Sequence, residues 1–247
     1  MNEAATTAGH PARPTPLDDP FTAALDTRQA RFAQRRGRIT RFDPRVSVFY
    51  GHPLVMTDAD WADTAALAGP GATVGLRDLH SPIPRGWDLV ETFDLVQYSG
   101  AGVVGAPDPD AVLLGTDDVP EMAALVDLTR PGPFLPRTVE LGDFLGHRDG
   151  GGRLVAMAGM RLRVPGWVEI SGVCTHPDAR GQGRARRLIA AVAYRIVAGG
   201  DTPFLHTTAD NPATRLYESM GFVLRSEVPL QIVRVPKGDR PCSDSMA

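Results

Sequence analysis

The residues of this sequence that most clearly suggest chemistry lie in a glycine-bearing loop at 180–185, with the sequence R-G-Q-G-R-A. An apolar, β-branched stretch precedes the loop from Trp167, and apolar residues recur at helical spacing over 188–196. The expected order is therefore strand, loop and helix. Free N–H groups of a loop and a helix N-terminus together bind anions, and glycine lets the backbone approach a phosphate closely. The pattern predicts a phosphorylated ligand at the end of this strand.

The strand before the loop carries further candidate groups. Period-two alternation predicts that Glu169, Val173 and Thr175 share one face, with Cys174 on the other. A carboxylate inside a sheet is costly unless it is hydrogen-bonded or functional, so Glu169 is either a catalytic group or a sheet-edge residue facing solvent. We interpret Cys174 as a buried structural thiol and not as a nucleophile, because no His or Asp partner for it is apparent in the sequence.

Length and composition narrow the classes of function. The chain has 247 residues, which allows one large domain or two small ones. A formal net charge of −3 argues against nucleic acid as a partner. Two cysteines, Cys174 and Cys242, make a disulfide framework unexpected. The sequence shows neither a signal peptide nor a membrane-length apolar run, and no metal-ligand spacing. We therefore expect a cytoplasmic protein with no metal and no membrane partner.

The elements that must position these groups follow from periodicity and turn residues. Residues 1–16 are expected to be a disordered leader, 17–105 an N-terminal lobe opening with a helix from Asp18 to Gly37, and 236–247 a polar tail. A glycine- and proline-rich segment at 100–110 is expected to separate the first half of the chain from the second. In that half we expect strands at 111–114, 145–148, 153–164, 167–175, 204–208 and 222–235, and helices after 116, over 137–144, after 184 and from Asn211 to Met220.

Asn211 and Tyr217, six residues apart in N-P-A-T-R-L-Y-E-S-M-G-F, complete a recognisable combination with the loop and with Glu169. Residues 110–235 resemble the GNAT superfamily of acyl-CoA-dependent N-acetyltransferases. The resemblance implies an α/β (α+β) fold whose mixed, mostly antiparallel sheet is splayed at the CoA site. The resemblance also leaves open that residues 17–105 form a degenerate copy of the GNAT fold.

The resemblance assigns a role to each group. Glu169 is expected to be the base that accepts a proton from the acceptor ammonium, and Tyr217 the acid that protonates the leaving thiolate. The N–H of Val173 is expected to hold the thioester carbonyl. The expected CoA-contacting residues are Val173, Cys174, Thr175, Arg180, Gly181, Gln182, Gly183, Arg184, Ala185 and Asn211. Asn211 is alternatively the cap of its helix, and Tyr217 alternatively a core aromatic residue.

The expected function is transfer of an acetyl group from acetyl-CoA to a primary amine, by direct attack in a ternary complex. The amine acceptor, a small molecule or a peptide, is unidentified, and an acyl group larger than acetyl and a homodimer are left open. The alternative is a non-catalytic regulatory module that binds acetyl-CoA. His206 lies in a strand that is expected to flank the splay, where it is either near the thioester or a satisfied core histidine.

Overall fold

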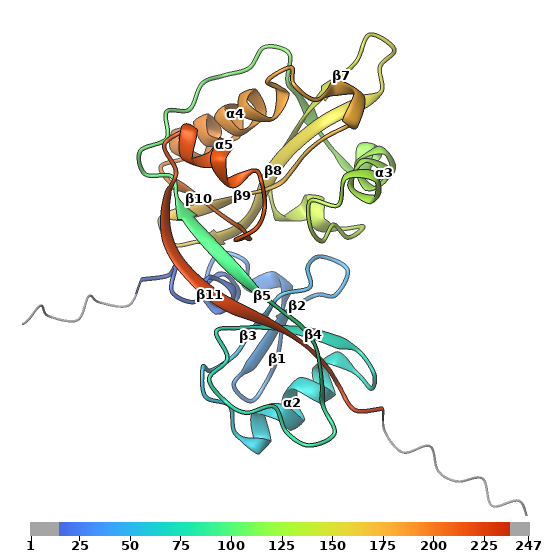
Figure 1. Ribbon diagram of the computed structural model, residues 1–247, viewed down its shortest axis with the longest axis vertical. Helices are drawn as coiled ribbons and strands as arrows, with labels where there is room; N and C mark the ends of the chain where they lie inside the picture. Colours follow the sequence, from blue (N-terminus) through green and yellow to red (C-terminus); the bar gives the residue numbers. More distant parts are fainter. Residues whose placement is uncertain (1–14, 238–247) are drawn as a thin grey trace, which may run out of the picture.

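The computed structural model describes residues 15–237. Within that range the chain forms a large and a small β-sheet joined by helices and loops (Figure 1). Most of the leader expected at 1–16 and of the tail expected at 236–247 lies outside the described residues. Cys242 also lies outside them. Cys174 is a buried free thiol.

The large sheet is built mainly from antiparallel neighbours. Its strands, in spatial order, are β4 (Thr73–Arg77), β11 (Val223–Arg234), β5 (Asp88–Ser99), β10 (Thr202–Thr208), β9 (Trp167–Thr175), β8 (Leu154–Val164), β7 (Phe144–Arg148) and β6 (Val112–Leu114). Only β9 and β10 pair in parallel among these described strands. The predicted α/β class with a mixed, mostly antiparallel sheet is therefore confirmed.

Helices cover both faces of the large sheet. The helices are α1 (Pro20–Asp26), α2 (Asp58–Ala68), α3 (Val119–Thr129), α4 (Arg184–Ala198) and α5 (Thr214–Ser219). Along β8, Ala156 and Ala158 pack in one core with Leu188 of α4, whereas Met157 packs in another core with Met122 of α3. Because neighbouring strand residues point to opposite faces, α4 and α3 lie on opposite sides of the sheet. Of the helices within 15–237, none has the length and apolar character required to cross a bilayer.

The first helix is shorter than the sequence predicts. Asp19 caps α1 and Pro20 takes its first position. The helix ends at Asp26 and not at Gly37: a turn and a 3-10 helix (Ala30–Phe32) follow it, and Ala33–Arg36 then pairs as a strand. The small sheet contains β1 (Ala33–Arg36), β2 (Ile39–Phe42) and β3 (Tyr50–Gly51), in that order. Gly37 adopts a φ of +52° in the turn between the first two strands, a conformation that favours glycine.

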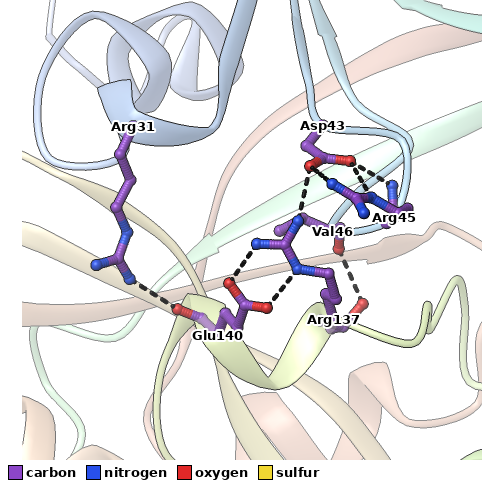
Figure 2. A network of polar contacts seen from close by, with 7 residues as sticks. Arg31, Asp43, Arg45, Val46, Arg137 and Glu140 are labelled. Carbon is purple, nitrogen blue, oxygen red and sulfur yellow. Dashed lines mark hydrogen bonds and ion pairs between the residues drawn. The ribbon is translucent and has the colours of Figure 1, made fainter.

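A network of arginines and carboxylates joins the N-terminal elements to the 3-10 turn Thr138–Leu141 (Figure 2). Nη1 of Arg137 donates to Oδ2 of Asp43 at 2.8 Å, and its Nη2 donates to Oε2 of Glu140 at 2.7 Å. The backbone N–H of Arg137 also donates to the carbonyl of Arg45 at 3.0 Å. The arginine thus bridges two segments that lie far apart in the sequence.

One strand from the first half of the chain, β5, lies inside the large sheet between β10 and β11 (Figure 1). Its Leu95 pairs with Thr208 of β10 on one side and with Val228 of β11 on the other. The sheet therefore does not divide at the boundary expected between 17–105 and 110–235. Both β4 and β5 precede that boundary and pair with strands that follow it.

The segment that connects β5 to β6 is packed closely on α4. The N–H of Ala106 donates to the carbonyl of Ala190 at 3.1 Å. A Cβ on Gly105 would lie 2.4 Å from the backbone nitrogen of Tyr194, so no larger residue fits there without moving the helix or the connection. The connection is therefore part of the packed structure.

A fragment containing residues 107–247 tests this arrangement. We expect it not to fold, because removal of β5 leaves both β10 and β11 with unpaired backbone groups inside the sheet. Circular dichroism and urea unfolding of the fragment, compared with the full chain, give the measurement. A cooperative unfolding transition in the fragment would show that β5 is dispensable.

Candidate functional site

The parallel strands β9 and β10 separate part-way along their length. Their ladder contains only three registered pairs, which are Thr202 with Trp167, Pro203 with Val168 and Phe204 with Glu169. Beyond Glu169 and Phe204, β9 continues to Thr175 and β10 to Thr208 without pairing to each other. The facing edges leave backbone donors and acceptors that an extended ligand can bind.

A β-bulge lies in β9 beside this gap. Met157 of β8 pairs with Cys174, and Gly159 pairs with Ser171, so β9 holds one residue more than β8 over this stretch. Gly172 sits in the bulge with a φ of +63°, which favours glycine. The extra residue reverses the alternation of side chains along the rest of the strand.

The bulge corrects the faces predicted from alternation. Val173 packs in the core beneath α4 together with Val168 and Ile170, and not on the face of Glu169. Cys174 packs instead in the core that contains α3. Alternation counted from Glu169 gives the wrong face because the inserted residue is invisible to a period-two pattern.

The glycine loop and the start of α4 have the geometry of an anion site. Gly181 and Gly183 adopt φ values of +75° and +70°, and Gly183 is the N-cap of α4. A Cβ at either glycine would meet no atom of the described residues within 4 Å, so the space beside them is free for a ligand. The first turn of α4 carries no acidic residue and no side-chain cap, which leaves its N–H groups and positive dipole end available. These features fit a pyrophosphate.

Glu169 lies at the point where the two strands separate, and it is fully buried. Nε and Nη2 of Arg161 donate to its two carboxylate oxygens, each at 2.8 Å. The backbone N–H of Leu162 donates to Oε2 at 3.3 Å, and Nδ1 of His206 lies 2.8 Å from Oε1. Both carboxylate oxygens are therefore occupied by donors from neighbouring strands.

These contacts do not fit the predicted base role of Glu169. Burial raises the pKa of its carboxyl, but the charge and hydrogen bonds of Arg161 outweigh burial, and with His206 they hold the pKa at about 2. A general base needs a pKa near the working pH, and this carboxylate remains ionised far below it. The geometry gives Glu169 the role of holding Arg161 and His206 in place.

His206 is a satisfied buried histidine. Its Nε2 lies 2.9 Å from Nε2 of Gln97, whose amide also donates to the carbonyl of Leu17 at 3.0 Å. Nη1 of Arg225 donates to Oε1 of Gln97 at 3.0 Å, which fixes the orientation of that amide. The partners fit a neutral imidazole that donates from Nδ1 to Glu169 and accepts at Nε2. Burial lowers the pKa of His206, in agreement with the neutral form.

Aromatic residues from the N-terminal elements cover this buried group. The guanidinium of Arg161 lies 4.5 Å from the ring centroid of Phe49. Phe49 stacks on Phe21 of α1 with centroids 4.4 Å apart, and Phe21 lies 6.0 Å from the His206 ring. The apex of the gap is therefore closed on this face by residues from the first 50 positions of the chain.

Tyr217 lies in the same core as Val173, beneath α4. Its ring packs edge-on against Phe222 with centroids 5.9 Å apart, and Tyr98 of β5 lies 6.4 Å away. Burial raises the pKa of Tyr217 to about 12, so the phenol keeps its proton at neutral pH. A protonated phenol near the gap can donate to a developing thiolate.

Other predicted contact residues lie on β9, in the loop that follows it and just before α5. The hydroxyl of Thr175 is buried and has no hydrogen-bond partner among the described residues, and Nε of Arg180 donates to the Thr175 carbonyl at 3.3 Å. Burial raises the pKa of Cys174 to about 11, which suits a structural thiol. The side chain of Asn211 accepts from the N–H of Ala213 at 2.9 Å, just before α5. Asn211 thus shapes the start of that helix.

Sequence reasoning missed three residues of this region, Arg161, Gln97 and Tyr98. The sequence contains a local signal for Arg161, because this charged residue interrupts an apolar strand. It stands eight residues before Glu169, across a two-residue Pro-Gly turn. Gln97 and Tyr98 had none, since they arrive from a strand more than 100 residues before His206 and Tyr217. Among residues 15–237, no cluster of three or more metal-ligating side chains is present.

A family model described as FR47-like protein matches residues 144–229. A solved structure from Novosphingobium aromaticivorans, assigned to the GNAT family as an acetyltransferase, is 36% identical over 92% of this chain and all of that chain, with a TM-score of 0.82. A GCN5-related N-acetyltransferase from Kribbella flavida is 18% identical, covering 87% and 96% of the two chains with a TM-score of 0.57, and shares the fold alone. Among curated proteins, none matches the chain in sequence.

The separated parallel strands above a glycine loop and a helix N-terminus are those of acyl-CoA-dependent acyltransferases. At 36% identity with the Novosphingobium structure over nearly its whole length, the chain belongs to the GNAT family. The predicted family is therefore confirmed, and the fold supports acyl-CoA-dependent acyl transfer in general.

The substitution Glu169→Gln tests the buried ion pair. We expect it to lower the free energy of unfolding at pH 7 by about 3–5 kcal/mol, because the Arg161 charge is left buried without a partner. Urea unfolding gives the measurement, with the exposed Glu227→Gln of β11 as the control, for which a change within about 0.5 kcal/mol is expected.

The same ion pair predicts that the free energy of unfolding depends on pH. The pKa of Glu169 is lowered on folding from 4.5 to about 2, so its contribution is complete above pH 4.5 and is lost as the pH falls toward 2. The stability difference between the wild type and Glu169→Gln should shrink over that window. An unchanged difference from pH 7 to pH 3 would show that the carboxylate is not stabilised by Arg161.

Proposed function

We propose that this chain transfers an acetyl group from acetyl-CoA to a primary amine by direct attack within a ternary complex. The observation that carries the proposal is the separation of β9 from β10 beyond Glu169, with the glycine loop and the start of α4 at the end of β9. This arrangement offers an extended slot for a pantetheine arm and an anion site for the pyrophosphate attached to it. Holding both substrates in one slot supplies a large part of the acceleration.

We assign roles in this arrangement to the residues that are expected to contact the donor. The backbone of residues 180–185 holds the pyrophosphate, and the free edge of β9 pairs with the pantetheine arm. The N–H of Val173 donates to the thioester carbonyl and stabilises the oxyanion that develops on attack. The unpartnered hydroxyl of Thr175 gives the arm one further polar contact.

Proton transfer requires an acid for the thiolate and a base for the amine. Tyr217, whose raised pKa keeps it protonated, donates its proton to the thiolate as the carbon–sulfur bond breaks. Glu169 is too acidic to take the proton of the acceptor ammonium near neutral pH, so we assign that proton to solvent. Glu169 acts instead as a positioning residue that holds the two strands at the point of separation.

We further propose that the N-terminal elements select the acceptor. Phe21 and Phe49 close the apex of the gap on the face opposite α4. Arg137 ties the 3-10 turn Thr138–Leu141 to Asp43 (Figure 2), and Leu141 of that turn packs in the same core as Phe21 and Phe49. An acceptor that approaches from this face therefore meets surfaces from both halves of the chain.

Acetyl-CoA binding and turnover are expected to occur together, which separates an enzyme from a regulatory module. Acetyl-CoA should raise the melting temperature, and free thiol should appear when a panel of amines and peptides is added. Differential scanning fluorimetry and a thiol-release assay give the two measurements. Stabilisation without thiol release from any acceptor would favour the non-catalytic module.

The substitution Tyr217→Phe should lower kcat by about 100-fold or more, which is the usual contribution of a general acid. Affinity for acetyl-CoA and stability should stay near wild type, because only a hydroxyl without a described hydrogen-bond partner is removed. The exposed Tyr194→Phe on α4 is the control and should keep full activity. Full activity of Tyr217→Phe with the true acceptor would remove Tyr217 from the mechanism.

A further inference from the structure

One edge of β5 has no neighbouring strand over residues 88–94. β5 runs beside β11 along its whole length (Figure 1). On its other side, β10 pairs only with residues 95–99, and the last pair is Thr208 with Leu95. No other strand within 15–237 pairs with β5 beyond that point. Residues 88–94 therefore form a free strand edge inside a chain that is otherwise well paired.

The backbone groups of this edge point outward in alternate residues. The carbonyl of Asp94 accepts from the N–H of Ala209 at 3.0 Å, just past the end of β10. In an antiparallel ladder, residues two apart direct their N–H and carbonyl groups to the same side, so Thr92 presents both of its groups on the free edge. Thr92 lies opposite Gln231 of β11 and is exposed. It offers a donor and an acceptor to an added strand.

The free edge continues the row of β10, which forms one wall of the gap. β9 ends at Thr175 and β10 at Thr208, so the gap is open at this end. Because β5 extends past its pair with Thr208, a chain paired with 88–94 takes up the row that β10 leaves. A chain that runs in the direction of β10, antiparallel to β5, has its N-terminus at the open end of the gap.

The charged side chains of the free edge are acidic and are not neutralised. Asp88, Glu91 and Asp94 are exposed, and none of them forms an ion pair with a described residue. Arg234 of β11 registers with Asp88 but forms no ion pair with it. Glu91 and Asp94 are three residues apart in an unbroken stretch of the ladder, so they present negative charge on opposite faces. The edge is therefore complementary to a strand with basic side chains.

A second copy of this chain fits the edge poorly. Antiparallel pairing centred on Glu91 would set Glu91 against its copy and Asp88 against Asp94. Like charges directly opposite one another destabilise a strand pair. The acidic side chains thus disfavour self-association of an edge on which Leu89 and Val90 are 52% and 46% exposed. The same charges favour a basic chain.

We propose that residues 88–94 bind the acceptor as an added β-strand, and that the acceptor is a basic peptide segment with a free N-terminus. The inference rests on the proposed function, for which it names the class of amine. Backbone bonds to Thr92 set the register, and Glu91 and Asp94 select arginine or lysine. The terminal nitrogen bonds to the acetyl carbon as the carbon–sulfur bond breaks, and the protons follow the routes assigned above.

The test uses the synthetic peptide A-R-V-R-R-V-R, whose only amine is its N-terminus. Isothermal titration calorimetry on the full chain with CoA present should show it binding about 10-fold or more tightly than A-E-V-E-E-V-E. Methylation of alternate backbone nitrogens should weaken the basic peptide by about 10-fold, because it removes strand hydrogen bonds and keeps the charge. Acetylation with acetyl-CoA, followed by mass spectrometry, should rank the three peptides in the same order.

Variants of the edge separate charge from backbone pairing. Glu91→Gln with Asp94→Asn should raise KM for the basic peptide about 3- to 10-fold and leave kcat near wild type. Asp117→Asn with Asp127→Asn is the matched control, since it removes two exposed charges beside β6 and on α3, and it should change neither. Thr92→Pro removes an outward N–H and keeps the ladder to β11, so it should weaken the basic peptide too. Circular dichroism confirms that each variant is folded.

Four outcomes would overturn the inference or its basis. Equal affinity for the basic, acidic and methylated peptides, or no binding of any, would reject the edge as an acceptor site. Binding of the basic peptide without its acetylation, while a small amine releases thiol, would show that the edge holds a partner other than the acceptor. A dimer in analytical ultracentrifugation that Thr92→Pro converts to a monomer would place a second copy on the edge. Absence of thiol release with every amine would reject the proposed function itself.

Discussion

The bidentate pair between Arg161 and Glu169 is the interaction on which the rest of the site depends. Parallel strands that separate give up backbone hydrogen bonds, and the separation needs a fixed starting point. Here that point is Glu169, the last residue of β9 that pairs with β10. Its carboxylate is bound by Arg161 from β8 and by His206 from β10, so one buried group ties three neighbouring strands together. The gap beyond it opens at a defined place.

The same pair binds the two halves of the chain to each other. From His206 the hydrogen bonds run through Gln97 of β5 to the carbonyl of Leu17, and Arg225 of β11 joins them. Phe49 covers the guanidinium from the other side. Because a buried charge needs all its partners, each of these segments is required for the others to be stable. The inserted strand β5 makes the same connection through the backbone (Figure 1).

The two faces of the gap differ in chemistry. On the α4 face, Val173 and Tyr217 share an apolar core, which suits an acyl thioester and a phenol that must stay protonated. On the opposite face, Glu169 and Arg161 form a closed ion pair beneath aromatic residues. A carboxylate in such a pair holds the neighbouring strands in place and does not exchange protons near neutral pH. The sheet thus separates the groups that serve the acyl donor from those that hold the architecture.

Features that depend on neighbouring residues could be predicted from the amino-acid sequence. The glycine loop, the helix that follows it and the Asn211 to Tyr217 segment are local patterns, and so is the hairpin that brings Arg161 to Glu169. The face of Val173, the low pKa of Glu169 and the place of β5 in the sheet depend instead on the folded arrangement. A bulge adds a residue that no period reveals, and the pKa of a carboxyl is set by partners from distant strands. Strand order depends on contacts between segments more than 100 residues apart, which local preferences do not encode.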